Sequence, residues 1–251
     1  MPVASGAKPA EPGFELTEHR FEATTSSGHV SALLMRPVGA DCLLVLGHSA
    51  GAGMRHPFME VLAARLADRR IATFWYQFPY IEHGRRRPDY QPILLKTVRS
   101  AVSAASAVSD GLPLFAGGKS MGGRMTSLVA SKGPLSTIQG IVFFGFPLHP
   151  AQKPGVERGE HLKDLDVPLL FLQGPRDKLT RLDLLEPVCR DFGQRATLHL
   201  VEGADHGFHV LKRSGRSDDE VQKELADATR YLDRRPRLPW LEGQLLKPEK
   251  R

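Results

Sequence analysis

Cysteine is scarce in this chain of 251 residues, which has only Cys42 and Cys189. Two cysteines are too few for the disulfide framework of a small secreted scaffold or for a cysteine-rich metal site. Cys42 lies in an apolar run that predicts a core strand, and Cys189 lies in a predicted helix. We therefore expect two reduced, buried thiols without a chemical role, and no metal site.

Long apolar runs are also missing. No stretch approaches the ~20 apolar residues of a membrane span. Residues 1–13 are rich in Pro, Gly and Ala and have no continuous apolar core of the kind found in signal peptides. These absences argue against membrane insertion and secretion, so we expect a soluble, cytoplasmic protein.

Acidic residues are fewer than basic ones, 28 against 34, which gives a formal net charge of +6. The basic excess gathers at Arg85-Arg86-Arg87, at residues 212–216 and at residues 230–251. Nucleic-acid binding would fit this charge, but no basic helix with interleaved aromatics and no known nucleic-acid fold pattern accompanies it. We therefore expect an ordinary basic surface rather than a nucleic-acid partner.

What the sequence does contain is an alternation of strand and helix patterns, with 41% hydrophobic residues to form a core. Alternating residues over 14–24 and 29–35 predict an antiparallel pair at a sheet edge, joined through residues 25–28. Later strands are expected over residues 42–46, 71–78, 138–146, 167–173 and 196–201, and helices over residues 58–70, 92–108, 181–192 and 217–234. This alternation predicts an α/β fold with a mostly parallel central sheet and helices on both faces.

The domain organisation follows from the same pattern. One domain spans residues 14–235, with a flexible leader over residues 1–13 and a tail over residues 236–251. The link over residues 147–166 has about twenty residues with three prolines, which is too short for a cap domain. We therefore expect an open site.

The run from Leu112 to Phe115 ends in a small-residue turn, Gly118-Lys119-Ser120-Met121-Gly122, and then opens into a helical pattern. The turn matches G-x-S-x-G, in which a sharp strand-to-helix reversal exposes the serine oxygen and leaves no room for side chains beside it. Ser120 is therefore the candidate nucleophile.

An activated serine needs a base, and the base needs a carboxylate to orient it. Asp177 follows the predicted strand 167–173, and His206 follows the strand 196–201, so both belong at the same carboxyl edge of the sheet. Alone, each would be an ordinary loop residue. The order Ser, Asp, His, with each residue after its own strand, predicts a catalytic triad.

Three nearby residues are weaker candidates for the same roles. His199 lies inside a predicted strand, and His209 lies beyond the centre of the loop that holds His206. Asp205 precedes His206 directly, which is a poor position from which to accept its Nδ1–H.

With these residues in place, the chain resembles the α/β-hydrolase superfamily and, more narrowly, the KANL3/Tex30 hydrolase-like family with its dienelactone-hydrolase-like relatives. The resemblance spans roughly residues 15–234 and rests on residues 48–54, 84–89, 118–123, 173–177 and 203–208. It implies an α/β-hydrolase fold and a serine-hydrolase site without a settled substrate. Dienelactone hydrolases use cysteine at the elbow, whereas this chain has Ser120.

The resemblance also implies an oxyanion hole formed by the backbone N–H groups of Met121 and Ala50. The latter lies in the loop after the strand 42–46, where Ser49 replaces the glycine that usually follows His48. We expect His48 to be a structural hydrogen-bonding residue rather than a catalyst.

Arg85, Arg86 and Arg87 follow the strand 71–78 and so begin at the same edge of the sheet as the triad. Consecutive arginines are usually solvated, or anchored to a nearby carboxylate such as Glu82 or Asp89. Alternatively, one of them leans over the open site and selects an anionic substrate.

Two functions remain open on the sequence alone. The first is a serine hydrolase, an esterase that acts on a small-molecule ester through an acyl-enzyme and needs no cofactor. The second is a non-catalytic scaffold or partner-binding protein with the same fold. Intact Ser120, Asp177 and His206 favour the enzyme, while the oligomeric state is left open.

Overall fold

The structure is a computed structural model that describes residues 13–133, 135 and 138–232. The predicted tail over residues 236–251 lies outside this part of the chain, as does the predicted leader except for Gly13. Within it, no helix has the length and apolar character needed to cross a membrane.

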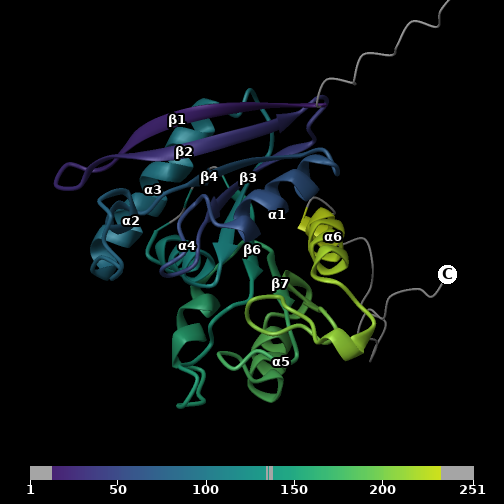
Figure 1. The fold of residues 1–251 in the computed structure, drawn as a ribbon. Helices are drawn as coiled ribbons and strands as arrows, with labels where there is room; N and C mark the ends of the chain where they lie inside the picture. Colours follow the sequence, from purple (N-terminus) through teal and green to yellow (C-terminus); the bar gives the residue numbers. More distant parts are fainter. Residues whose placement is uncertain (1–12, 134, 136–137, 233–251) are drawn as a thin grey trace, which may run out of the picture.

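A single sheet of eight strands runs through the molecule in the order β1-β2-β4-β3-β5-β6-β7-β8 (Figure 1). The antiparallel pairs are β1 with β2 and β2 with β4, and all other neighbours are parallel. The strands are β1 Phe14–Thr24, β2 Gly28–Pro37, β3 Cys42–Gly47, β4 Ile71–Tyr76, β5 Leu114–Lys119, β6 Ile138–Phe144, β7 Leu169–Gln173 and β8 Ala196–Leu200. The predicted antiparallel edge and mostly parallel sheet are both confirmed.

Helices cover both faces of this sheet (Figure 1). Helices α1 Pro57–Ala67 and α6 Asp218–Thr229 pack on one face, and α3 Gln91–Ala107, α4 Met121–Ser131 and α5 Leu182–Asp191 pack on the other. Every residue of β3, β4, β5 and β7 is buried, as expected for parallel strands covered on two sides. Cys42 and Cys189 are both buried, and neither forms a disulfide, as predicted.

The helix boundaries agree with the sequence signals, with three differences. One is that helix α6 ends at Thr229, earlier than the predicted residue 234, and a 3₁₀ turn, Arg230–Leu232, follows it. Helix α6 begins with a capping box, in which Ser217 and Glu220 each accept the other's backbone N–H. Helix α1 ends at Ala67, three residues early, and the chain reverses at Arg70, whose φ is 61°. A single helical turn, α2 Pro79–Glu82, also forms where a plain loop was expected.

The link after β6 remains short and unelaborated. Its only regular element in the described residues is the 3₁₀ helix η1 Glu157–Asp164, which packs against α4. Among the residues that the structure describes, no cap domain covers the carboxyl ends of the strands, as predicted from the length of this link.

Candidate active site

Ser120 lies between β5 and α4 in a backbone conformation that non-glycine residues rarely adopt, with φ 50° and ψ −110°. Its own N–H donates to Phe144 O at 3.1 Å, so the turn is held against β6. A residue kept in such a strained conformation signals a local functional demand. The elbow predicted from G-x-S-x-G has formed.

The glycines around Ser120 are required by close contact with the end of β3. A Cβ added at Gly118 would lie 2.2 Å from Gly47 O, and one added at Gly122 would lie 2.1 Å from the same atom. Since real Cβ atoms do not approach backbone so closely, neither position can carry a side chain without displacing β3 or the elbow. Gly47, which the sequence pattern did not single out, is thus a third partner of the turn.

The structure brings Ser120, His206 and Asp177 into one hydrogen-bonded line. His206 Nε2 lies 2.8 Å from Ser120 Oγ, and His206 Nδ1 lies 2.6 Å from Asp177 Oδ2. The side chain of Asp177 is fully buried, whereas that of His206 is 26% exposed. The serine oxygen therefore has a base beside it, and the base has a carboxylate behind it.

A fourth residue, Gln173, orients this carboxylate. Its Oε1 must accept the N–H of Phe146 at 3.1 Å, since a backbone N–H can only donate, and its Nε2 therefore donates to Asp177 Oδ2 at 2.6 Å. The other oxygen, Asp177 Oδ1, accepts the N–H of Leu179 at 2.7 Å. Gln173 ends a predicted strand, but no sequence signal indicated that its side chain would reach Asp177.

The weaker candidates are engaged elsewhere. His199 lies 2.8 Å from Glu224, and His209 lies 2.7 Å from Asp218. Asp205 Oδ1 accepts the N–H groups of Gly207 and His209, at 2.8 and 3.0 Å. Asp205 thus shapes the loop that holds His206 and does not orient its ring.

The loop that contains Ala50 is fixed by buried polar contacts. His48 is fully buried, its Nε2 accepts the N–H of Phe78 at 3.1 Å, and its Nδ1 donates to Ser49 O at 2.8 Å. Burial lowers the pKa of His48 to about 4, so the ring is neutral. The expectation of a structural His48 agrees with these contacts.

The two expected oxyanion donors, the N–H groups of Met121 and Ala50, lie in the elbow and in the loop after β3. Met121 directly follows Ser120, and Ala50 lies three residues after Gly47, which packs on the elbow. Within the described part of the chain, neither N–H finds a hydrogen-bond acceptor. Both groups remain candidates for this role.

The arginine loop follows α2. Arg85 Nη2 lies 2.7 Å from Asp89 Oδ1, and the Asp89 side chain is only 4% exposed. Glu82 instead accepts the N–H and hydroxyl of Ser31. Arg86 and Arg87 are exposed. For Arg85 the structure favours the anchoring alternative, while selection of an anion by Arg86 or Arg87 stays a prediction.

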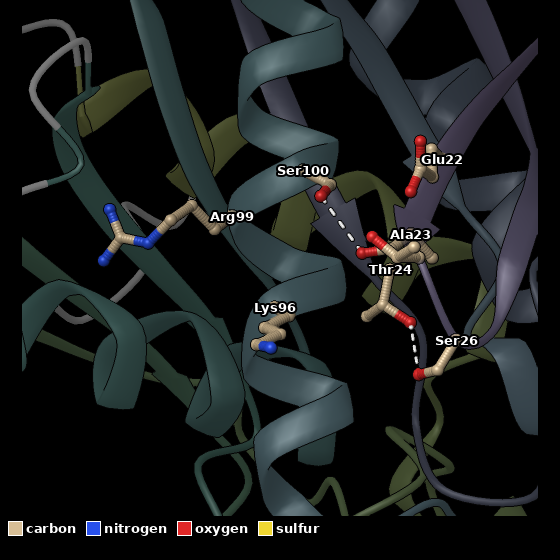
Figure 2. Close-up of a pocket in the computed structure, with 8 residues that line it drawn as sticks. Glu22, Ala23, Thr24, Ser26, Lys96, Arg99 and Ser100 are labelled. Atoms are coloured by element: carbon tan, nitrogen blue, oxygen red, sulfur yellow. Dashed lines mark hydrogen bonds between the residues drawn. The ribbon is translucent and has the colours of Figure 1, made fainter.

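A polar cavity of about 520 Å³ lies away from these residues, between the end of β1 and helix α3 (Figure 2). Lys96, Arg99 and Ser100 line it from α3, and residues 22–26 line it from the β1 hairpin. None of the predicted site residues lines this cavity. No group of three or more His, Cys, Asp or Glu side chains that could hold a metal ion occurs among the residues described.

Comparison with known proteins places this chain in a family. The sequence profile described as alpha/beta hydrolase domain matches residues 40–232. The chain belongs to this family. The match begins just before β3 and includes every residue of the Ser120, Asp177 and His206 arrangement, and it agrees with the KANL3/Tex30-like resemblance.

Solved structures share the fold at low sequence identity. A dienelactone hydrolase from Anabaena variabilis is 17% identical, with a TM-score of 0.67 over 87% of this chain and 98% of its own. A serine hydrolase without a lid from Xanthomonas campestris is 16% identical, with a TM-score of 0.66 over 94% and 100%. A cold-adapted esterase from an Arctic intertidal metagenomic library is 19% identical, with a TM-score of 0.61 over 92% and 98%. This α/β-hydrolase domain therefore shares its fold with esterases and serine hydrolases.

Proposed function

We propose that this chain is a serine hydrolase that cleaves carboxylic esters through an acyl-enzyme and needs no cofactor. The observation that carries the proposal is the continuous line from Asp177 Oδ2 to His206 Nδ1, 2.6 Å, and from His206 Nε2 to Ser120 Oγ, 2.8 Å. Both distances are those of strong hydrogen bonds. A scaffold has no physical need for a strained serine, a facing imidazole and a buried carboxylate together.

In the proposed acylation, His206 Nε2 takes the proton of Ser120 as Oγ attacks the ester carbonyl. The negative charge that develops on the carbonyl oxygen is held by the N–H groups of Met121 and Ala50. Collapse of this intermediate breaks the bond to the alcohol oxygen, which receives the proton from His206. Asp177 keeps the Nδ1–H tautomer and stabilises the imidazolium that forms in between.

Deacylation repeats these steps with water. His206 Nε2 takes a proton from water as the water oxygen attacks the acyl carbon, and it then returns the proton to Ser120 Oγ as the carboxylic acid leaves. One ester and one water give one acid and one alcohol, and the enzyme ends in its starting state. No metal or organic cofactor enters this scheme.

The substrate class follows from the open edge of the sheet. With only η1 in the link after β6, little protein is available to enclose a long lipid chain. Small esters, or the acylated end of a larger molecule, suit such a site. Structures with this fold that are described as an esterase and as a serine hydrolase without a lid support the same class.

Hydrolysis of a panel of activated esters, thioesters and lactones tests the proposal. We expect turnover by the wild type and a loss of about 10⁴-fold or more in Ser120→Ala, as for other removed nucleophiles. Ser131→Ala is the matched control, because Ser131 lies on the same helix and its hydroxyl donates only to Leu128 O among the residues described. Absence of turnover by a folded wild type, or equal rates for wild type and Ser120→Ala, would favour the scaffold alternative.

A further inference from the structure

Lys119, the residue before Ser120, carries a charged side chain in a buried position. It ends β5 and is only 6% exposed. Burial of an ammonium group in a protein interior is unfavourable unless the charge finds partners. The mechanism proposed above does not use this side chain, so its burial calls for a separate reason.

The Lys119 ammonium contacts the loop that carries His206. Nζ donates a hydrogen bond to the backbone carbonyl of His206. It also lies 5.1 Å from the ring centre of Phe208 and 5.7 Å from that of Phe58, both within the range of cation–π attraction. The charge is therefore held between two aromatic faces and a carbonyl oxygen.

Gly145, directly after β6, closes the same cluster. A Cβ added there would lie 3.1 Å from Lys119 Nζ and 3.5 Å from His206 Nδ1. The ammonium and the imidazole thus both lie beside Gly145, where an added side chain would crowd the ammonium. Lys119 and His206 belong to a single packed unit.

We propose that Lys119 is a positioning residue that fixes the backbone of His206, and through it the imidazole, over Ser120. The proposal rests on the serine-hydrolase function proposed above. Lys119 and Ser120 are adjacent on the elbow, whereas His206 lies on the loop after β8, three strands away in the sheet. The hydrogen bond from Nζ therefore ties the base directly to the chain segment that carries the nucleophile.

The strength of the hydrogen bond from Lys119 Nζ to the His206 carbonyl depends on whether Lys119 is protonated. A hydrogen bond from an ionised donor is roughly twice as strong as a neutral one. Asp177 and Asp205 face the ammonium and favour its charge, but burial outweighs them and lowers the pKa of Lys119 to about 8. The uncharged groups recorded against it are the rings of Phe58 and Phe208 and the backbone carbonyl of His206. The proton is therefore lost in mildly alkaline solution, and the tie to His206 weakens there.

The expected consequence is a fall in serine reactivity above pH 8. The decline follows the loss of the Lys119 charge. A lysine that only fills space would cause no such alkaline decline as long as the protein stays folded. The pH profile therefore separates positioning from packing.

The experiment measures the rate of Ser120 labelling by a fluorophosphonate probe from pH 6 to pH 10, with thermal unfolding recorded at each pH. Lys119→Met keeps the apolar stem and removes the charge, Lys119→Arg keeps a charge throughout this range, and Lys96→Met on α3 is the control. For the wild type and Lys96→Met we expect a decline of about 5-fold or more above pH 8. Lys119→Met should label about 10-fold more slowly at pH 7 and show no alkaline decline.

Lys119→Arg should restore part of the rate at pH 7 and also lack the decline near pH 8. A labelled wild type without an alkaline limb, or a folded Lys119→Met with the wild-type rate and profile, would overturn the positioning role. If Lys119→Met does not fold, the wild-type and Lys119→Arg profiles decide in the same way. A folded wild type that is not labelled at any pH rejects the hydrolase function itself, which is a separate result.

Discussion

At the scale of single residues, Asp177 shows how the site controls a proton. Its buried carboxylate accepts three N–H groups, from Leu179 to Oδ1 and from Gln173 and His206 to Oδ2. A buried carboxylate remains an anion when such donors offset its lost hydration. Because a carboxylate only accepts hydrogen bonds, His206 must carry its proton on Nδ1 to bond with Asp177 Oδ2. Its Nε2 is then unprotonated and faces Ser120 Oγ.

Asp177→Asn should retain the fold and lose activity for a specific reason. The N–H of Leu179 requires oxygen at the Oδ1 position, so the new amide nitrogen must replace Oδ2 and donate to His206 Nδ1. The imidazole is then protonated on Nε2 and cannot take the proton of Ser120. We expect kcat/KM for an activated ester to fall about 10⁴-fold, and Tm to fall as well, because Gln173 Nε2 loses its acceptor at Oδ2. Near-normal activity would mean that another carboxylate serves His206.

Gln173→Met tests whether the hydrogen bond from Gln173 orients the Asp177 carboxylate. The thioether fills a similar volume but neither donates to Asp177 nor accepts the N–H of Phe146. We expect about 1–3 kcal/mol lower stability from the unpaired buried groups. A roughly 10-fold lower kcat/KM should accompany it through the looser carboxylate. Urea unfolding and ester kinetics measure both, with exposed Gln194→Met as control, and an unchanged kcat/KM would remove Gln173 from the orienting role.

At the scale of elements, the site is an assembly of loops on rigid strands. The elbow follows β5, the loop of Asp177 follows β7 and the loop of His206 follows β8, while the loop of Ala50 follows β3. Since these strands run parallel, their carboxyl ends share one edge. Helix α2 and the arginine loop follow β4 and approach from the antiparallel side of the sheet.

The arginine loop gives a prediction about substrate charge. Asp89 already neutralises Arg85, so we expect Arg86 or Arg87 to carry the preference for an anionic ester. Alanine at the responsible position should lower kcat/KM about 10-fold for a carboxylate-bearing ester and leave a neutral ester unaffected. Added salt should weaken this difference. Equal losses for both esters, or no loss in either Arg86→Ala or Arg87→Ala, would assign these arginines to the solvated surface.

The sequence predicts the secondary-structure elements of this protein better than the contacts between distant side chains. Apolar runs and turn residues located the strands, and the order Ser120, Asp177, His206 located the loops, because both depend on local patterns and on parallel strands sharing an edge. The single turn α2 has too few residues to show a period. The contacts of Gln173 with Phe146 and of Lys119 with His206 depend on strand order across the sheet, which no local spacing encodes.

At the scale of the whole molecule, the two-sided core determines the response to acid. His48 is fully buried, and burial lowers its pKa to about 4. An unfolded histidine binds its proton near pH ~6.5. Between these values the unfolded chain holds one proton more than the folded chain, so the stabilising effect is complete above pH 6.5 and is lost as the pH falls toward 4.

We therefore expect the free energy of unfolding to decrease by up to about 3 kcal/mol over this range through His48. Protonation would also turn Nε2 into a donor that opposes the N–H of Phe78. Urea unfolding between pH 4.5 and 7.5 measures the slope, which should be smaller by about one proton in His48→Gln. Equal slopes for the two proteins would show that His48 is not the responsible group.

The central claim is that the fold activates the oxygen of Ser120, and covalent labelling by a fluorophosphonate tests it most directly. Intact mass and peptide mapping should show one adduct, on Ser120, in the wild type and in Ser131→Ala. Ser120→Ala should not react, and His206→Ala should react at least about 10³-fold more slowly, since the imidazole takes the serine proton. A folded wild type that stays unlabelled, or an adduct on another residue that persists in Ser120→Ala, would contradict the account.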